Sequence, residues 1–247
     1  MLFKRYIGID YSGRDLPTKR LSGLQLFEAS VNHEPSKVYS KPGKNWNWCR
    51  KEIAEWLIKE LETDQRIIVG VDHCFSFPLN KFDSNETWAG FLERFTTDWK
   101  SHEQAVKKAD IVNTYPDCGK LLRLTEKWTS SAKSTFDCNG PGVACSTFAG
   151  LPWLREIRQE VGALVHFWPF DGWIPPAEKS VIAEVYPSLF HNRYERESRT
   201  SDEHDAYSTA RWLKETDERG FLNRYFTPPL TIDERVVASR EGWILGV

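Results

Sequence analysis

The sequence predicts an α/β fold built on a mixed β-sheet, and three observations support this prediction. Residues 6–10 and 67–72 are short, β-branched apolar runs, which are typical of buried strands. Residues 49–61 lie between them and repeat apolar side chains at helical spacing. A parallel pair of strands requires such a crossover helix. We therefore expect the two strands to lie side by side and parallel.

The first part of the chain is expected to supply more of this sheet. Residues 21–29 and 36–41 have the composition of two further short strands. Together with the first strand they would form an antiparallel meander. The apolar positions of the expected helix share one face, whereas charged residues mostly take the other; the apolar set is Cys49, Ile53, Trp56, Leu57 and Leu61.

Residues 78–162 depart from this simple pattern and predict a helical elaboration of the core. A strong amphipathic helix is indicated by Trp88, Phe91, Leu92, Phe95 and Trp99. Residues 101–109 predict a second helix, and Leu151, Leu154 and Ile157 predict a third. No linker rich in Pro, Ser or Gly interrupts the chain. We therefore expect residues 1–247 to form a single domain that contains this insertion.

The last part of the chain offers two candidates for a final parallel strand, residues 163–168 and 181–186. A helix is expected over about residues 202–216, with Ser201 as its N-cap. Its first turn contains acids, which the helix dipole favours there. Thr231 to Glu234 has the spacing of a capping box for a short final helix, and residues 243–247 are expected to form an edge strand.

Composition limits the classes of function. The net charge of -2 provides no global basic field, so any contact with nucleic acid must use a local patch. No apolar run approaches the roughly 18 residues of a membrane helix. Residues 1–5 lead directly into a strand, and we expect a cytoplasmic protein without a membrane partner. The five cysteines lack paired zinc spacing and are expected to be free thiols.

Acidic residues end both expected parallel strands and open the helix near residue 202. Asp10 and Asp72 should meet because adjacent parallel strands end at the same edge of a sheet. Asp205 would close the cluster from the helix, and Asp202 lies one turn earlier on nearly the same face. Close carboxylates repel each other unless a cation lies between them. The pattern therefore predicts a metal site, with Asp10 as the bridging ligand.

Glu184 is a further candidate metal ligand, and His204 is a further candidate catalytic residue. Glu184 interrupts the apolar run 181–186, and a buried glutamate without a partner is costly. The alternative for Glu184 is an edge-strand position facing water. His204 would position a water molecule or the leaving group. Its alternative is a surface histidine in the first helical turn.

This chemistry is typical of enzymes that hydrolyse phosphodiester bonds with two divalent ions about 3.5–4 Å apart. Mg²⁺ or Mn²⁺ is the expected cofactor, because both prefer carboxylate oxygens. Arg193, Arg196 and Arg199 lie between Glu184 and the acidic helix, where they would contact phosphates. The alternative for these arginines is a solvated surface loop. The expected catalytic set is Asp10, Asp72, Glu184, Asp202, His204 and Asp205.

These segments resemble a family of predicted RNase H-like nucleases, known as domain of unknown function 429. The matching pieces span almost the whole chain: residues 8–13, 71–78, 150–154, 167–173, 184–187 and 204–206. Residues 204–207, His-Asp-Ala-Tyr, are also similar to the last catalytic helix of RuvC-type resolvases and of the RuvC domain in RNA-guided nucleases. There the aspartate binds metal, and the matching residue here is Asp205.

The resemblance implies an RNase H-like fold with a mixed, five-stranded central sheet and helices on both faces. It also implies two-metal hydrolysis of a nucleic acid substrate, DNA or RNA. The chain departs from the RuvC pattern at its second acid, which is Asp72 rather than a glutamate. The shorter side chain would change the metal spacing or preference.

Two other classes of function remain open. An actin-like or sugar-kinase-like ATPase shares the core and begins with a similar Gly-Ile-Asp strand. The residues after Asp10 and Asp72 do not form the Asp-x-Gly phosphate turns of that class. The other class is a catalytically degenerate module that binds nucleic acid or protein, which suits the nearly neutral charge. The oligomeric state is also open, and cleavage of branched substrates would favour a dimer.

Overall fold

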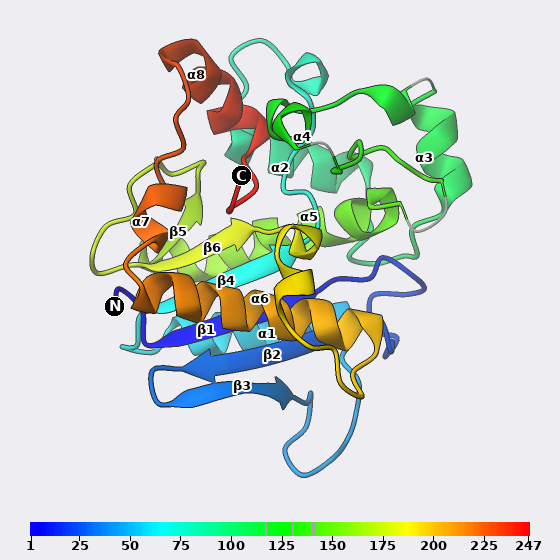
Figure 1. Cartoon of the computed structure of the whole chain (residues 1–247). Coiled ribbons are helices and arrows are strands. Elements are labelled where there is room, and N and C mark those ends of the chain that lie inside the picture. The colour runs from blue at the N-terminus through cyan, green and yellow to red at the C-terminus, as the bar shows by residue number, and fades with distance from the viewer. Residues whose placement is uncertain (117, 130, 140–141) are drawn as a thin grey trace.

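A mixed β-sheet forms the centre of the protein (Figure 1). The computed structural model describes residues 1–116, 118–129, 131–139 and 142–247, and within these ranges the sheet has six strands in the order β3-β2-β1-β4-β6-β5. The strands are β1 Arg5–Asp10, β2 Gln25–Ser30, β3 His33–Val38, β4 Ile67–Asp72, β5 Val165–Trp168 and β6 Ser180–Glu184. The fold class is therefore α/β, as predicted.

The order and direction of the strands follow the sequence-based topology in the first half of the sheet. β1, β2 and β3 form the predicted antiparallel meander, and β4 lies parallel to β1 after the crossover helix α1, Arg50–Leu61. β2 and β3 are each displaced from the predicted ranges. Leu24 N donates to Leu21 O, so a turn occupies the start of the first predicted range. A tight turn then starts β3 at His33.

The expectation of five strands was wrong, because both late candidates are strands. β6 pairs with β4 and β5 pairs with β6, all in parallel. β6 is buried along its full length, and it lies inside the sheet rather than at its edge. β5 is the edge strand on this side. The two candidates were therefore consecutive members of one sheet, not alternatives.

Helices cover both faces of the sheet. Helix α6, Ser201–Glu218, lies across the face seen in Figure 1, and α1 lies behind the sheet. Alternate strand residues enter two separate hydrophobic clusters, because successive side chains of a strand point to opposite faces. Tyr6 packs in the cluster of α6, whereas Ile7 packs in the cluster of α1 and α5.

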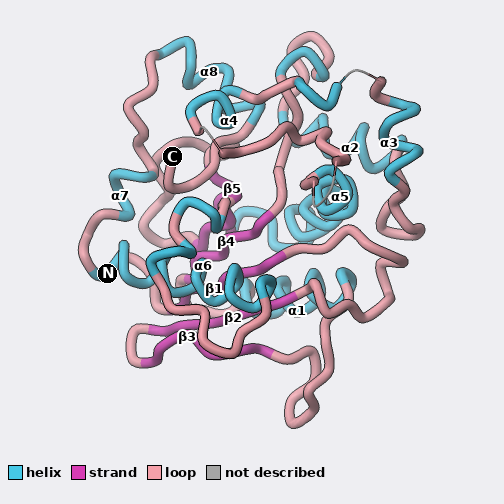
Figure 2. Tube along the Cα trace, turned by 45° about the vertical axis from the view of Figure 1, so that its right-hand side comes forward, coloured by secondary structure: helices cyan, strands magenta, loops and turns pink. Residues whose placement is uncertain are grey.

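The insertion after β4 is helical over much of its length, as Figure 2 shows by colour. It contains α2 Trp88–Asp98, α3 Lys108–Thr114, α4 Leu124–Trp128 and α5 Ala144–Val161. The prediction of a helix over residues 101–109 was wrong. The Ser101 hydroxyl donates to Phe148 O at 2.6 Å, which anchors a turn there, and α3 begins only at Lys108. α5 contains the predicted apolar face and packs against α1.

Single-turn 3₁₀ helices complete the connections: Leu79–Lys81, Cys118–Lys120, Gly162–Leu164, Pro187–Leu189 and His191–Arg193, the last of which is η5. The five cysteines are free, as predicted. Within the described ranges, no helix combines the length and the apolar character needed to cross a membrane.

The C-terminal part differs from the prediction at two points. The N-cap of α6 is Thr200 rather than Ser201, because the Thr200 hydroxyl accepts from Glu203 N at 3.2 Å and the Glu203 carboxylate accepts from Thr200 N at 2.9 Å. Residues 243–247 do not form an edge strand: residues 245 and 246 form a turn, and Leu245 N donates to Glu184 O. α7 is Leu222–Tyr225, and α8 is Ile232–Glu241 with the expected Thr231 capping box.

Candidate metal centre

Two glycines allow α6 to lie directly on the sheet. Gly8 of β1 and Gly70 of β4 face each other in the parallel register. A Cβ atom added to Gly8 would lie 2.2 Å from Ala206 O, and one added to Gly70 would lie 2.7 Å from Thr209 Cγ2. Atoms cannot approach so closely, and any larger residue would push the helix away. The glycine pair therefore fixes the N-terminal half of α6 against the strands.

Asp10 and Asp72 lie two residues beyond these glycines and face the same side of the sheet. Strand alternation gives this orientation, and the register places the two aspartates opposite each other. Asp205 directly precedes Ala206 on α6, the helix that packs against these glycines. One oxygen from each of the three carboxylates lies within 4.8 Å of the others. The expectation that these three residues meet is confirmed, and metal binding by them stays a prediction.

The electrostatics of this group favour a cation. Burial raises the pKa of Asp10 well above its usual range, and the negative charges of Asp72, Asp202 and Asp205 raise it further. Burial also raises the pKa of Asp72, with further contributions from Asp205 and Glu184. Each of the three residues keeps part of its surface exposed. A divalent cation would replace lost hydration and cancel the mutual repulsion.

His191 is a member of this site that the sequence did not indicate. Its Nδ1 lies 2.6 Å from Asp205 Oδ1, and the residue belongs to η5. A hydrogen bond of this kind fixes the orientation of a ligating carboxylate. The contact depends on residues 187–200 folding back over α6, and no sequence spacing between a histidine and an aspartate 14 positions apart reveals that.

The sequence predicts His204 as a catalytic residue. In the structure its ring contacts the backbone of the turn that carries His191. Its Nε2 lies 3.1 Å from His191 O. Burial lowers the pKa of His204, which favours the neutral ring, and Nε2–H then donates to the carbonyl. His204 thus holds the turn that carries His191.

Glu184 lies on the wrong face of the sheet for the predicted ligand role. It pairs with Val71, so its side chain leaves on the face opposite to that of Asp72. Its carboxylate accepts from Arg123 Nη1 at 2.8 Å and from Phe75 N at 3.0 Å. Both Arg123 and Glu184 are buried. Neither sequence-based alternative anticipated this buried ion pair, because its arginine comes from a distant loop.

Asp202 lies beside the group without entering it. Its charge raises the pKa of Asp10, and Ser201 Oγ donates to its Oδ1 at 3.3 Å. A methyl-sized Cβ on Gly23 would lie 3.4 Å from Asp202 Oδ2, so the carboxylate faces the loop before β2. Asp202 therefore lies at the edge of the group, close enough for its charge to raise the pKa of Asp10.

The three predicted phosphate-binding arginines differ in how many contacts their side chains make with the protein itself. Arg199 Nη1 donates to Glu197 at 3.0 Å, and its guanidinium lies 3.8 Å from the Tyr207 ring centroid. Arg196 Nε donates to Arg199 O at 2.8 Å. Arg193 is exposed, and its side chain has no hydrogen bond or ion pair with any residue that the structure describes. Of the three, Arg193 is the most available for a phosphate.

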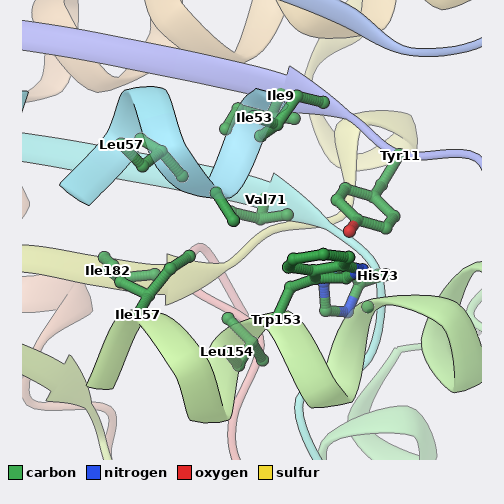
Figure 3. Close-up of a pocket in the computed structure, with 12 residues that line it drawn as sticks. Ile9, Tyr11, Ile53, Leu57, Val71, His73, Trp153, Leu154, Ile157 and Ile182 are labelled. Atoms are coloured by element: carbon green, nitrogen blue, oxygen red, sulfur yellow. The ribbon is translucent and has the colours of Figure 1, made fainter. Parts of the chain in front are cut away.

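The residues that follow the two aspartates point to the other face of the sheet. Tyr11 and His73 contact each other with ring centroids 4.6 Å apart. They line an apolar cavity of about 20 Å³ between the sheet, α1 and α5, which Figure 3 shows. The Tyr11 hydroxyl and Trp153 Nε1 are buried there without a hydrogen-bond partner among the described residues. The volume suits about one water molecule, so this is no substrate pocket.

Comparison with protein-family models, with curated proteins and with solved structures finds no match to this chain. The RNase H-like family suggested by the sequence motifs therefore stays a prediction. The geometry of the three carboxylates and their supporting residues is what bears on function.

Proposed function

We propose that this protein is a nuclease of RNase H-like fold that uses Mg²⁺ or Mn²⁺ to hydrolyse phosphodiester bonds. The observation that carries the proposal is the convergence of Asp10, Asp72 and Asp205, whose oxygens lie within 4.8 Å of one another. An all-carboxylate set suits hard divalent cations, whereas zinc prefers nitrogen and sulfur ligands. The meander followed by parallel strands, with α6 across them, supports the fold assignment.

The chain's own residues would hold and orient the ion. Asp10 and Asp72 supply ligands from fixed strand ends, and Asp205 supplies one from α6. His191 donates to Asp205 Oδ1 and leaves the other oxygen free to ligate. When bound, a divalent ion lowers the pKa of a coordinated water and stabilises charge on phosphate oxygens. The aspartates would thus place that chemistry at the open edge of the sheet.

The binding of two ions, rather than one, stays a prediction. Three grouped carboxylates account for one ion, and a second ion needs further oxygen ligands. Asp202 is the candidate, because its charge already bears on Asp10. Substrate phosphate oxygens would complete such a site.

Cleavage assays with matched variants test this function. Labelled single-stranded, duplex and branched DNA and RNA are incubated with the wild type in Mg²⁺, Mn²⁺ or EDTA. Cleavage should require metal and should fall by at least about 100-fold in Asp10→Asn and Asp205→Asn. The control is Asp233→Asn, which changes an exposed acid in the first turn of α8. Equal cleavage by the wild type and Asp10→Asn would mean contamination and would refute the proposal.

A further inference from the structure

The loop between β3 and α1 emerges at the same edge of the sheet as the candidate metal centre. Asp10 pairs with Gln25, and the neighbouring Leu26 pairs with Val38 at the end of β3. Strands in a sheet are about 4.8 Å apart, so the start of this loop lies roughly 10 Å from Asp10. Figure 1 shows the loop projecting below β3. We call residues 39–47 the β3–α1 loop.

Two aromatic side chains of this loop are exposed. Trp46 is 45% exposed and Tyr39 is 36% exposed. Trp48, two residues after Trp46, behaves in the opposite way: it is 3% exposed, and its Nε1 donates to Val38 O at 2.8 Å. Trp48 thus anchors the loop to the sheet and Trp46 remains outside. Part of the Trp46 indole is therefore accessible to a ligand.

Cations lie over both exposed rings. The Arg20 guanidinium is 4.8 Å from the Trp46 ring centroid, and Lys41 Nζ is 5.1 Å from it. Lys37 Nζ lies 5.2 Å from the Tyr39 ring. Aromatic faces and positive charge are therefore interleaved. This is the combination that contacts bases and phosphates of a single strand.

The tip of the loop presents Lys41 and one further cation, Lys44, on a defined turn. Lys41 and Lys44 form an isolated β-bridge around Pro42 and Gly43, and Gly43 has φ of +71°. Proline followed by a residue with positive φ is typical of a tight turn, which limits the flexibility of the tip. Within the described chain, neither lysine forms a side-chain ion pair.

The charge of this segment departs from that of the whole chain. Residues 36–47 contain Lys37, Lys41 and Lys44 and no acid, although the chain has a net charge of -2. Lys37 is already paired with Glu203 and Arg20 with Glu52, whereas neither tip lysine has an ion pair with a described residue. A basic surface in an acidic chain attracts a polyanion to one place. Because the whole chain has a net charge of -2, any contact with nucleic acid requires a local basic patch of this kind.

We propose that the β3–α1 loop binds an unpaired strand of nucleic acid and guides it to the metal centre. Trp46 and Tyr39 would stack on bases, and Lys41 and Lys44 would contact phosphates. Base faces are accessible only where the strand is unpaired, so a single strand or a frayed end fits and a closed duplex does not. The guiding role rests on the proposed nuclease function, whereas strand binding is measurable without it.

Fluorescence anisotropy in EDTA measures binding without cleavage. The probes are labelled 20-mers of deoxythymidine and uridine and a blunt duplex of equal length. Trp46→Ala should weaken single-strand binding about tenfold. Lys41→Ala combined with Lys44→Ala should lower the slope of log affinity against log salt by about 1.4, since each phosphate contact contributes about 0.7. Duplex binding should be weaker than single-strand binding in the wild type.

A matched control uses Trp128, which is also 45% exposed but lies on α4, at the opposite end of the view in Figure 1. Trp128→Ala and Lys127→Ala should bind as the wild type does, with folding of all variants checked by thermal melts. Wild-type affinity in both loop variants, or equal duplex binding, would overturn the inference. Loss of binding in the loop variants together with no metal-dependent cleavage by the wild type would support strand binding and refute the nuclease proposal.

Discussion

Glu184 lies opposite Val71 in the parallel register of β4 and β6, not opposite Asp72. This offset of one residue turns its carboxylate away from the three grouped aspartates and toward Arg123. A shift of one residue in strand register moves every side chain of the strand to the other face of the sheet, because side chains alternate with a period of two residues. An acid at a strand end is thus assigned to a site by register as much as by residue type.

Glu184→Gln should therefore reduce stability rather than metal binding. Two buried carboxylates, Glu184 and Glu126, pair with the buried Arg123, and the substitution removes the charge of one of them. Breaking a buried pair of this kind costs about 3–5 kcal/mol in the free energy of unfolding. Urea unfolding measures this cost. Glu93→Gln removes the exposed pair with Arg155 and should cost no more than about 1 kcal/mol. A stable Glu184→Gln protein that has lost Mn²⁺ affinity would restore Glu184 as a ligand.

Asp10→Asn should stabilise the metal-free protein, because it removes one of several mutually repelling carboxylates. We expect an increase in Tm of about 3 °C without metal. In the wild type, Mn²⁺ should raise Tm, and in the variant it should have little effect. Differential scanning fluorimetry with and without Mn²⁺ checks both results. A lower Tm for the metal-free variant would contradict the electrostatic account.

The same substitution has a predicted pH dependence. The pKa of Asp10 is higher in the folded chain than in the unfolded chain, so its ionisation opposes folding. Stability without metal is gained as pH falls through the folded pKa toward the ordinary value. The Tm difference between Asp10→Asn and the wild type should therefore be largest at neutral to alkaline pH and should shrink on acidification. Melting curves over a pH series in EDTA measure it, and a difference that grows in acid has the wrong sign.

His191→Ala should weaken Mn²⁺ binding about tenfold, since it removes the donor that orients Asp205. His191→Asn keeps a side-chain N–H and should retain part of the affinity. Isothermal titration calorimetry measures both constants. His102→Ala, a histidine of the insertion, serves as the control. If the two His191 variants bind Mn²⁺ as the wild type does, the hydrogen bond to Asp205 does not orient a ligand.

Gly8→Ala should separate α6 from the sheet and destabilise the protein. The added methyl would lie 2.2 Å from Ala206 O, and overpacking of this kind costs about 1–3 kcal/mol or more. Gly90→Ala is the matched control, because its Cβ would lie 3.5 Å from Glu86 Cγ inside α2. It should be neutral or stabilising by up to about 1 kcal/mol. Chemical unfolding compares them, and equal stabilities would contradict the close helix–sheet contact.

The sequence predicted what depends on local pattern. β-branched runs located β1 and β4, and their terminal aspartates met because parallel strands end at one edge. Asp205 joined them because a helix that opens with acids lies across those ends. The strands and their terminal aspartates follow from residue type and periodicity. The position of α6 across the strand ends also depends on packing.

The remaining features depend on packing between distant segments. Strand register assigned Glu184 to Arg123, and a folded-back turn brought His191 to Asp205. The Ser101 hydrogen bond to Phe148 replaced an expected helix with a turn. The sequence does show Gly8 and Gly70 inside two strands, and a glycine in a strand often marks a close approach of another backbone. That signal would have indicated where α6 lies.

An anomalous difference map from crystals soaked in Mn²⁺ tests the central claim most directly. We predict a peak about 2.0–2.3 Å from oxygens of Asp10, Asp72 and Asp205, which is lost in crystals of Asp205→Asn. A map without a peak between these three side chains, from crystals in which all three are ordered, would contradict the account.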